Sequence, residues 1–105
     1  MDDGSVPAAV PADAVLVRTT SEFDETTAPQ GLLRAHHLAA DVWGVVEVRA
    51  GALRFVFEDA RDDAAVTVSA GDRQVIPPAT PHHIEFVGPV RFVIEFHRPG
   101  GTVPA

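Results

Sequence analysis

The sequence contains no cysteine and no lysine, and each absence narrows the chemistry open to it. Without cysteine there is no disulfide framework, and there is no thiolate to bind a metal or act as a nucleophile. Any metal site must therefore use nitrogen and oxygen ligands. The eight basic residues are all arginines, and fifteen acidic residues bring the formal net charge to −7. This balance argues against nucleic acid or an anionic membrane as a partner.

Long apolar runs are also missing. No segment reaches the length of a membrane span, and the first thirteen residues begin acidic, without an apolar stretch of signal-peptide length. We therefore expect a cytoplasmic protein with no membrane partner. The 105 residues and the hydrophobic content of 46% suffice for one modest core. The expected organisation is a flexible N-terminal tail over residues 1–13, one small domain over 14–98, and a C-terminal tail over 99–105.

What the chain does contain is a series of short β-forming runs separated by glycine and proline. Ala50-Gly51 divides two such runs and predicts an antiparallel hairpin, and Gly88-Pro89 predicts another turn. The charged run 58–63 predicts a solvated loop. Seven or eight short strands without a convincing helix indicate an all-β fold, a small sandwich or barrel. The expected strands are 14–18, 43–49, 53–57, 65–69, 73–76, 82–87 and 90–97, with an extended segment over 32–38, a connector or single helical turn over 21–25 and a turn over 26–31.

Between Gly71 and His82 a glycine, a pair of prolines and a histidine stand at fixed offsets, immediately before a β-forming run. Glycine permits a backbone with positive φ, and each proline fixes φ at about −65°. Together they hold the direction of the residue that follows. The pattern therefore predicts a fixed direction for the side chain of His82.

The five histidines fall on three of the expected extended segments. In a closed antiparallel barrel, strands far apart in sequence can meet at one interior site. Side chains alternate across a strand, so only one histidine of each adjacent pair can point inward. His82 shares a face with Ile84 and Phe86 and is the inward candidate of its pair. Polarity does not decide between His36 and His37.

On the last expected strand, alternation separates Glu95 and His97 from Phe92, Ile94 and Phe96, although a strand buried on both faces could aim Glu95 into a cavity. Two histidines and a carboxylate, or three histidines, can bind Zn, Fe, Mn or Ni and leave coordination positions open for water or a ligand. A carboxylate can orient the other nitrogen of a ligating ring. Taken singly, a histidine near a strand end is more often a surface residue. The candidate orienting carboxylates are Glu47, Glu85 and Glu95.

The string Gly71-x5-Pro77-x-Ala79-x2-His82 resembles the second signature motif of the cupin superfamily, with alanine in place of the inner glycine. From about residue 26 to residue 98 the chain is similar to the small cupins named for tellurite resistance (TehB/YeaR-like). The resemblance implies a double-stranded β-helix, or jelly-roll barrel, with a metal in its mouth held by His36 and His82. Gly44 stands where the first cupin motif has glutamate, so the usual set of four ligands does not carry over. Other matching positions are 27–31, Trp43, 48–53, 82–85 and 92–96, while Phe86 replaces the final asparagine of the second motif.

We therefore expect a metal-binding cupin with His36 and His82 as ligands of a divalent metal, Glu95 or His97 as a third ligand, and a small anion or metabolite completing the coordination. The family name suggests a link to tellurite or oxidative stress. Catalysis of a dioxygenase-like or isomerase-like kind would use the metal to polarise a bound oxygen or to activate water or dioxygen. Two alternatives stay open. One is a non-catalytic module that senses an oxyanion or small ligand, and the other is a metal-free barrel whose exposed strand edges form a homodimer.

Overall fold

The structure, a computed structural model, describes residues 10–33, 38, 40–58 and 65–99. Within these ranges the chain forms β-strands and one short 3-10 helix but no α-helix, which confirms the all-β expectation. No helix in them is long and apolar enough to cross a membrane. The elements are β1 (Ala14–Thr19), β2 (Phe23–Asp24), η1 (Gln30–Leu33), β3 (Trp43–Phe57), β4 (Ala65–Ser69), β5 (Arg73–Ile76) and β6 (His82–Pro99).

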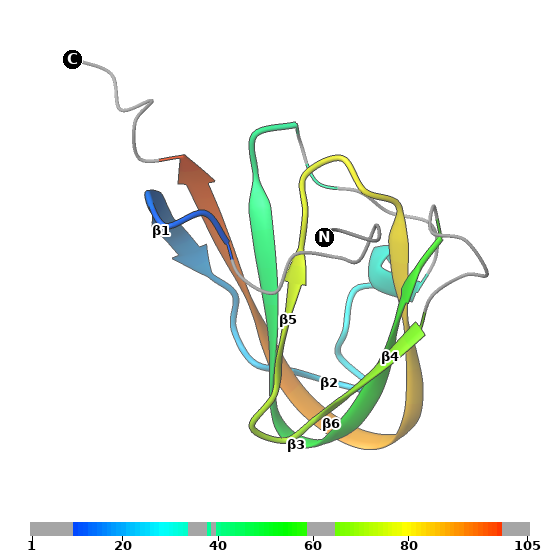
Figure 1. The fold of residues 1–105 in the computed structure, drawn as a ribbon. Helices are drawn as coiled ribbons and strands as arrows, with labels where there is room; N and C mark the ends of the chain where they lie inside the picture. The colour runs from blue at the N-terminus through cyan, green and yellow to red at the C-terminus, as the bar shows by residue number, and fades with distance from the viewer. Residues whose placement is uncertain (1–9, 34–37, 39, 59–64, 100–105) are drawn as a thin grey trace.

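Two long strands, β3 and β6, organise the fold. They pair antiparallel along almost their whole length, from Trp43 opposite His97 to Phe57 opposite His82. Figure 1 shows both strands bending at the same end of the molecule, so that the two halves of the sheet face each other. β5 pairs with the first half of β3 and β4 with its second half, while β1 and β2 pair with the second half of β6. The two halves enclose the core as a small barrel.

The predicted hairpin at Ala50-Gly51 is wrong, because β3 continues through this dipeptide. The register between β3 and β6 shifts on both sides of it, which marks bulges rather than a turn. Gly51 has a φ of +73°, and a Cβ there would lie 2.0 Å from the carbonyl oxygen of Pro89. The predicted turn at Gly88-Pro89 is also wrong, since β6 runs through it. Both dipeptides bend continuous strands where the two backbones come close.

Several of the shorter elements match the sequence. β4 and β5 have the predicted bounds, and β1 extends one residue further than predicted. The predicted connector over 21–25 contains the two-residue strand β2. The 3-10 helix η1 begins in the predicted turn over 26–31 and continues through Leu32 and Leu33, so the extended segment predicted over 32–38 is wrong at its start. Residues 34–37, with His36 and His37, and residues 59–63 of the predicted acidic loop lie outside the described residues.

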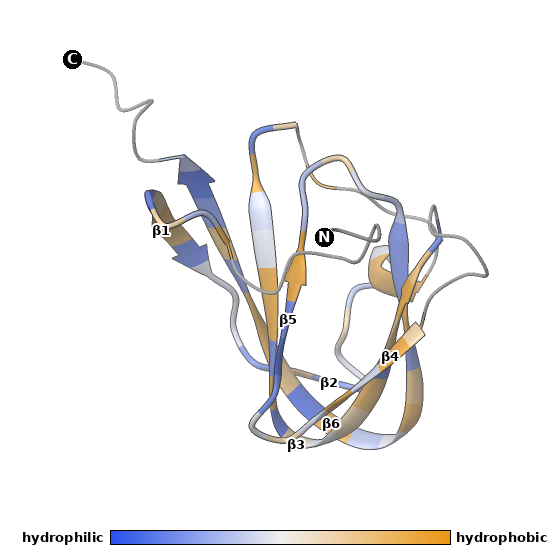
Figure 2. Ribbon diagram, viewed as in Figure 1, coloured by the Kyte–Doolittle hydropathy of each residue, from blue (hydrophilic) through white to orange (hydrophobic). Residues whose placement is uncertain are grey.

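The core lies between the facing halves of the sheet. Alternate residues of β6 point into it, among them Ile84, Phe92 and Ile94. The bulges in β3 change which positions face inward, from even-numbered ones such as Val46 to odd-numbered ones such as Phe55. Figure 2 shows apolar and polar residues interleaved along both long strands. Burying each large apolar side chain contributes roughly 1.5–3 kcal/mol relative to exposure.

Candidate functional site

His82 lies in the barrel interior, at the first residue of β6. Its side chain is buried, with only 2% of the residue exposed. The imidazole stacks on the ring of Phe55 with centroids 5.1 Å apart and planes 20° from parallel. Phe55 belongs to the core cluster. The inward orientation predicted from strand alternation is therefore confirmed for His82.

A backbone carbonyl defines the tautomer of His82. The Nδ1 atom of the ring lies 2.8 Å from the carbonyl oxygen of Thr80. A carbonyl oxygen only accepts hydrogen bonds, so Nδ1 carries a proton and donates it. In the neutral imidazole the lone pair is then on Nε2, the nitrogen that can bind a metal or accept a hydrogen bond.

The proline corner before β6 positions this carbonyl. Ala79 has a φ of +55°, a left-handed conformation, and its N–H donates to the carbonyl of Leu38 at 3.0 Å. The hydroxyl of Thr80 donates to the carbonyl of Pro78 at 3.0 Å, and the carbonyl of Pro81 accepts the N–H of Glu58 at the same distance. These bonds tie the corner to two other parts of the chain. They hold the Thr80 carbonyl in place beside His82.

Gly44, which stands at the glutamate position of the first cupin motif, faces the interior and is enclosed by apolar side chains. It pairs with Ile76 on one side and with Phe96 on the other. A Cβ at Gly44 would lie 3.0 Å from Cδ1 of Leu38 and 3.1 Å from Cδ1 of Ile76. A carboxylate here would have to displace both side chains. The interior at this position is therefore apolar.

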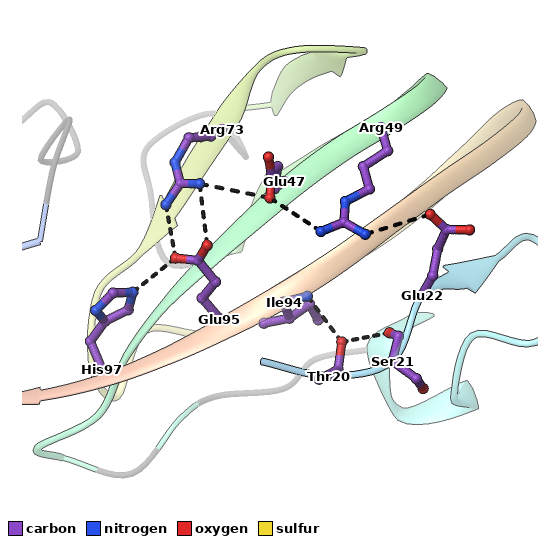
Figure 3. Close-up of polar contacts among 9 residues, drawn as sticks. All are labelled: Thr20, Ser21, Glu22, Glu47, Arg49, Arg73, Ile94, Glu95 and His97. Carbon is purple, nitrogen blue, oxygen red and sulfur yellow. Dashed lines mark hydrogen bonds and ion pairs between the residues drawn. The ribbon is translucent and has the colours of Figure 1, made fainter. Parts of the chain in front are cut away.

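Glu95 and His97 lie on the opposite face of the sheet from His82. Ile94 belongs to the core, so alternation along β6 turns Glu95 and His97 away from it. Glu95 accepts hydrogen bonds from Nη2 of Arg73 at 2.8 Å and from Nε2 of His97 at 3.0 Å (Figure 3). The Arg73 guanidinium, and after it His97, lowers the pKa of Glu95. The structure thus brings Glu95 and His97 to each other and not to His82.

The same outer face carries a chain of ion pairs, which Figure 3 shows running across the strands. Glu47 lies 3.8 Å from Arg73 and 4.0 Å from Arg49, and Arg49 lies 3.8 Å from Glu22. Distances this long between half-exposed groups contribute little individually, about 0–1 kcal/mol. We interpret these ion pairs as structural contacts of the protein surface.

His83 lies in a hollow of about 430 Å³ on the outer face, with two carboxylates. Its Nδ1 is 2.5 Å from Oε2 of Glu58, and its Nε2 is 2.9 Å from Oε2 of Glu85. Glu85 first, and then Glu58, raises the pKa of His83. Arg54 donates to Glu85 at 3.2 Å. The sequence reasoning missed this cluster, because Glu58 reaches His83 only through the pairing of β3 with β6.

A metal needs more ligands than the described part of the barrel interior supplies. Three protein ligands are usual even for an open site. Among the described residues no three histidine, aspartate or glutamate side chains come together as a metal site. His82 contributes one nitrogen, while His36 and His37 lie outside the described residues. A metal centre would therefore need further ligands from outside the described residues.

Solved structures resemble this fold. A protein from E. coli (strain K12) aligns with a TM-score of 0.78 at 25% identity, covering 85% of this chain and 94% of its own. TehB from Haemophilus influenzae aligns with a TM-score of 0.76 at 16% identity, covering 84% of this chain but 32% of TehB. The chain thus spans about a third of the length of that protein. A cupin-2 domain containing protein from Shewanella frigidimarina gives a TM-score of 0.51 at 25% identity, over 83% of this chain and 72% of its own.

These likenesses confirm the predicted cupin double-stranded β-helix. A search of curated proteins gave no match. The model of the TehB-like domain family matches residues 18–94, which is most of the chain and includes the corner before His82. The chain therefore belongs to the TehB-like domain family.

Proposed function

We propose that this domain binds a small ligand in the barrel interior, with Nε2 of His82 as the atom that contacts it. The support is the hydrogen bond from Nδ1 of His82 to the carbonyl of Thr80. A carbonyl that accepts a hydrogen bond from the other ring nitrogen fixes the tautomer and orientation of histidines that ligate metals. Stacking on Phe55 holds the same ring from its face. A buried histidine restrained in two ways keeps one orientation in the barrel interior.

The occupant we favour is a divalent metal, Zn, Fe, Mn or Ni, held by His82 together with His36. The pairing with His36 rests on the family resemblance, and neutral imidazole is a common ligand of these metals. When bound, such a metal would polarise an oxygen of a further ligand. A small anion or metabolite completes this proposed site. The link to tellurite or oxidative stress is part of the proposal and rests on the family name.

A second candidate function is ligand sensing without a metal and without turnover. The apolar packing around Gly44, where the cupin motif has its glutamate, favours it. In this case Nε2 of His82 accepts a hydrogen bond from a hydroxyl or amide group of the ligand. The two candidates share the binding atom but differ in whether a metal lies between His82 and the ligand.

Zinc retention in three proteins tests the proposal. Wild type, His82→Ala and His83→Ala are loaded with Zn²⁺ and desalted, and their metal content is measured. His83→Ala is the matched control, because it removes an imidazole from the adjacent residue on the outer face. We expect wild type and His83→Ala to bind zinc equally, and His82→Ala to bind it at least about tenfold more weakly.

Thermal melts followed by circular dichroism establish that each variant is folded. Equal zinc retention by folded His82→Ala and by wild type would refute the metal site. If the wild type retains no zinc, manganese, iron or nickel, the metal-free candidate takes its place.

A further inference from the structure

We propose a second binding site, for a small molecule that joins a carboxylate to an apolar body, at the edge of the sheet between β1 and β6. The site is a hollow of about 250 Å³ lined by Val17, Arg18, Val42, Phe96 and Arg98. His82 does not line it. The inference therefore does not depend on the function proposed for the barrel interior.

A bulge in β1 aims Arg18 at this hollow. Leu16 pairs with His97, and regular antiparallel pairing would place Arg18 opposite Glu95. Instead the register shifts between Leu16 and Arg18, so that Arg18 pairs with Phe96. Bulges redirect side chains and are common beside functional sites. Here the bulge turns a cation away from a carboxylate and toward an aromatic ring.

The guanidinium of Arg18 is held over Phe96, with Cζ 5.2 Å from the ring centroid. This is cation–π distance, and the contact restrains the long side chain. By contrast Arg49, Arg54 and Arg73 each lie within 4.0 Å of a glutamate. In the part of the chain that the structure describes, no carboxylate makes an ion pair with Arg18. Its charge is available to an anion in the hollow.

Arg98 brings a second guanidinium to the rim of the same hollow. Its Nη1 lies 3.7 Å from Oδ2 of Asp41, and both side chains are more than half exposed, at 58% and 60%. Such a surface pair contributes only about 0–1 kcal/mol. Arg98 can therefore exchange Asp41 for a bound carboxylate at little cost.

The lining of the hollow defines the class of ligand. Val17, Val42 and Phe96 form an apolar wall, and guanidinium groups bind carboxylates through paired charge-assisted hydrogen bonds. The volume lies just below the range of about 300–1,000 Å³ that suits drug-sized ligands. The ligand is thus small, such as one aromatic ring or a short alkyl chain bearing one carboxylate. Inorganic phosphate lacks the apolar body, and a neutral alcohol lacks the charge.

Titration with benzoate, followed by isothermal calorimetry and by the backbone amide shifts of residues 17, 18 and 96, tests the site. Benzyl alcohol and inorganic phosphate are the comparison probes. The proteins are wild type, Arg18→Gln and Arg91→Gln, the last of which removes the same charge from an exposed position on β6. His82→Ala separates this site from the barrel interior.

We expect benzoate to bind wild type, Arg91→Gln and His82→Ala alike, and Arg18→Gln about tenfold or more weakly, as for the loss of a charge-assisted hydrogen bond. Benzyl alcohol and phosphate should both bind more weakly than benzoate. Equal binding of benzoate to Arg18→Gln and wild type overturns the proposal. So does the absence of benzoate binding to wild type at millimolar concentration, whatever the result for metal at His82.

Discussion

Ala79 has a backbone conformation that is unfavourable for an L-residue. It has a φ of +55° and is the only non-glycine residue with positive φ in the described ranges. An L-residue in this conformation is about 1–2 kcal/mol less stable than in the right-handed one. The second signature motif of the cupin superfamily, which residues 71–82 resemble, has glycine at the position of Ala79. The strain is tolerated because the hydrogen bond from the Ala79 N–H to the carbonyl of Leu38, together with the neighbouring prolines, restricts the backbone to this conformation.

Replacing Ala79 by glycine should therefore stabilise the protein. Relief of the strain outweighs the extra freedom that glycine gives the unfolded chain, which costs about 0.4–1 kcal/mol. We expect Ala79→Gly to gain up to about 1 kcal/mol in the free energy of unfolding, measured in urea at unchanged slope. Ala70→Gly is the control, because Ala70 has no positive φ. It should lose stability, and a loss in both variants would contradict the account of the corner.

Single residues also show what alternation can and cannot predict. The inward side chain of His82 and the separation of Glu95 from Phe92 and Ile94 follow from the period of two along a strand. The partners of these residues do not. The bond between Arg73 and Glu95 needs β5 and β6 to lie on either side of β3, which no local pattern specifies.

At the scale of the elements, β3 and β6 bend together near Gly51, where the backbone of β6 leaves no room for a side chain on β3. A Cβ on Gly51 would lie 2.0 Å from the carbonyl oxygen of Pro89, so only glycine allows the contact. The bend turns one long antiparallel pair into the two facing halves of the barrel (Figure 1). His82 and its stacking partner Phe55 lie on the half that follows the bend in β3 and precedes it in β6.

Gly51→Ala should destabilise the protein much more than Gly71→Ala. Both glycines have positive φ, +73° and +92°, but a Cβ on Gly71 would have no atom within 4 Å. Gly71→Ala therefore measures the strain alone, about 1–3 kcal/mol. Gly51→Ala adds the overlap with Pro89, which we expect to cost about a further 1–3 kcal/mol.

The free energy of unfolding in urea, measured side by side for both variants, checks this difference. Equal losses would mean that the close approach of β3 to β6 at Gly51 does not hold the bend.

The strands themselves are predictable from the sequence, whereas the continuity of β3 through Ala50-Gly51 is not. Glycine and proline mark a turn and a bulge equally well, and only the pairing partner distinguishes the two. Ala50-Gly51 would be a hairpin turn if 43–49 paired with 53–57. In the structure both runs pair with β6 instead, one with each half of it. The bulge that redirects Arg18 lies in a run of Val and Leu that gives no local sign of it.

At the scale of the whole molecule, the barrel separates two kinds of polar chemistry. Carboxylates and arginines form networks on the outer face, where they pair with one another (Figure 3). Among the described residues, His82 is the buried polar one. Desolvating a polar group is unfavourable unless it is hydrogen-bonded, and the Thr80 carbonyl supplies one such bond. An apolar interior that retains one oriented imidazole is suited to recognise a ligand there.

The most direct test of this claim is the nitrogen-15 spectrum of the imidazole rings at neutral pH, with and without Zn²⁺. Long-range couplings identify which ring nitrogen carries the proton, and assignment uses the His82→Ala and His83→Ala variants. The account predicts the Nδ1–H tautomer for His82. It also predicts that Zn²⁺ changes the chemical shift of Nε2 of His82 and leaves the chemical shifts of the His83 nitrogens unchanged. A proton on Nε2 of His82 in the free protein, or a zinc response at His83 and none at His82, would contradict it.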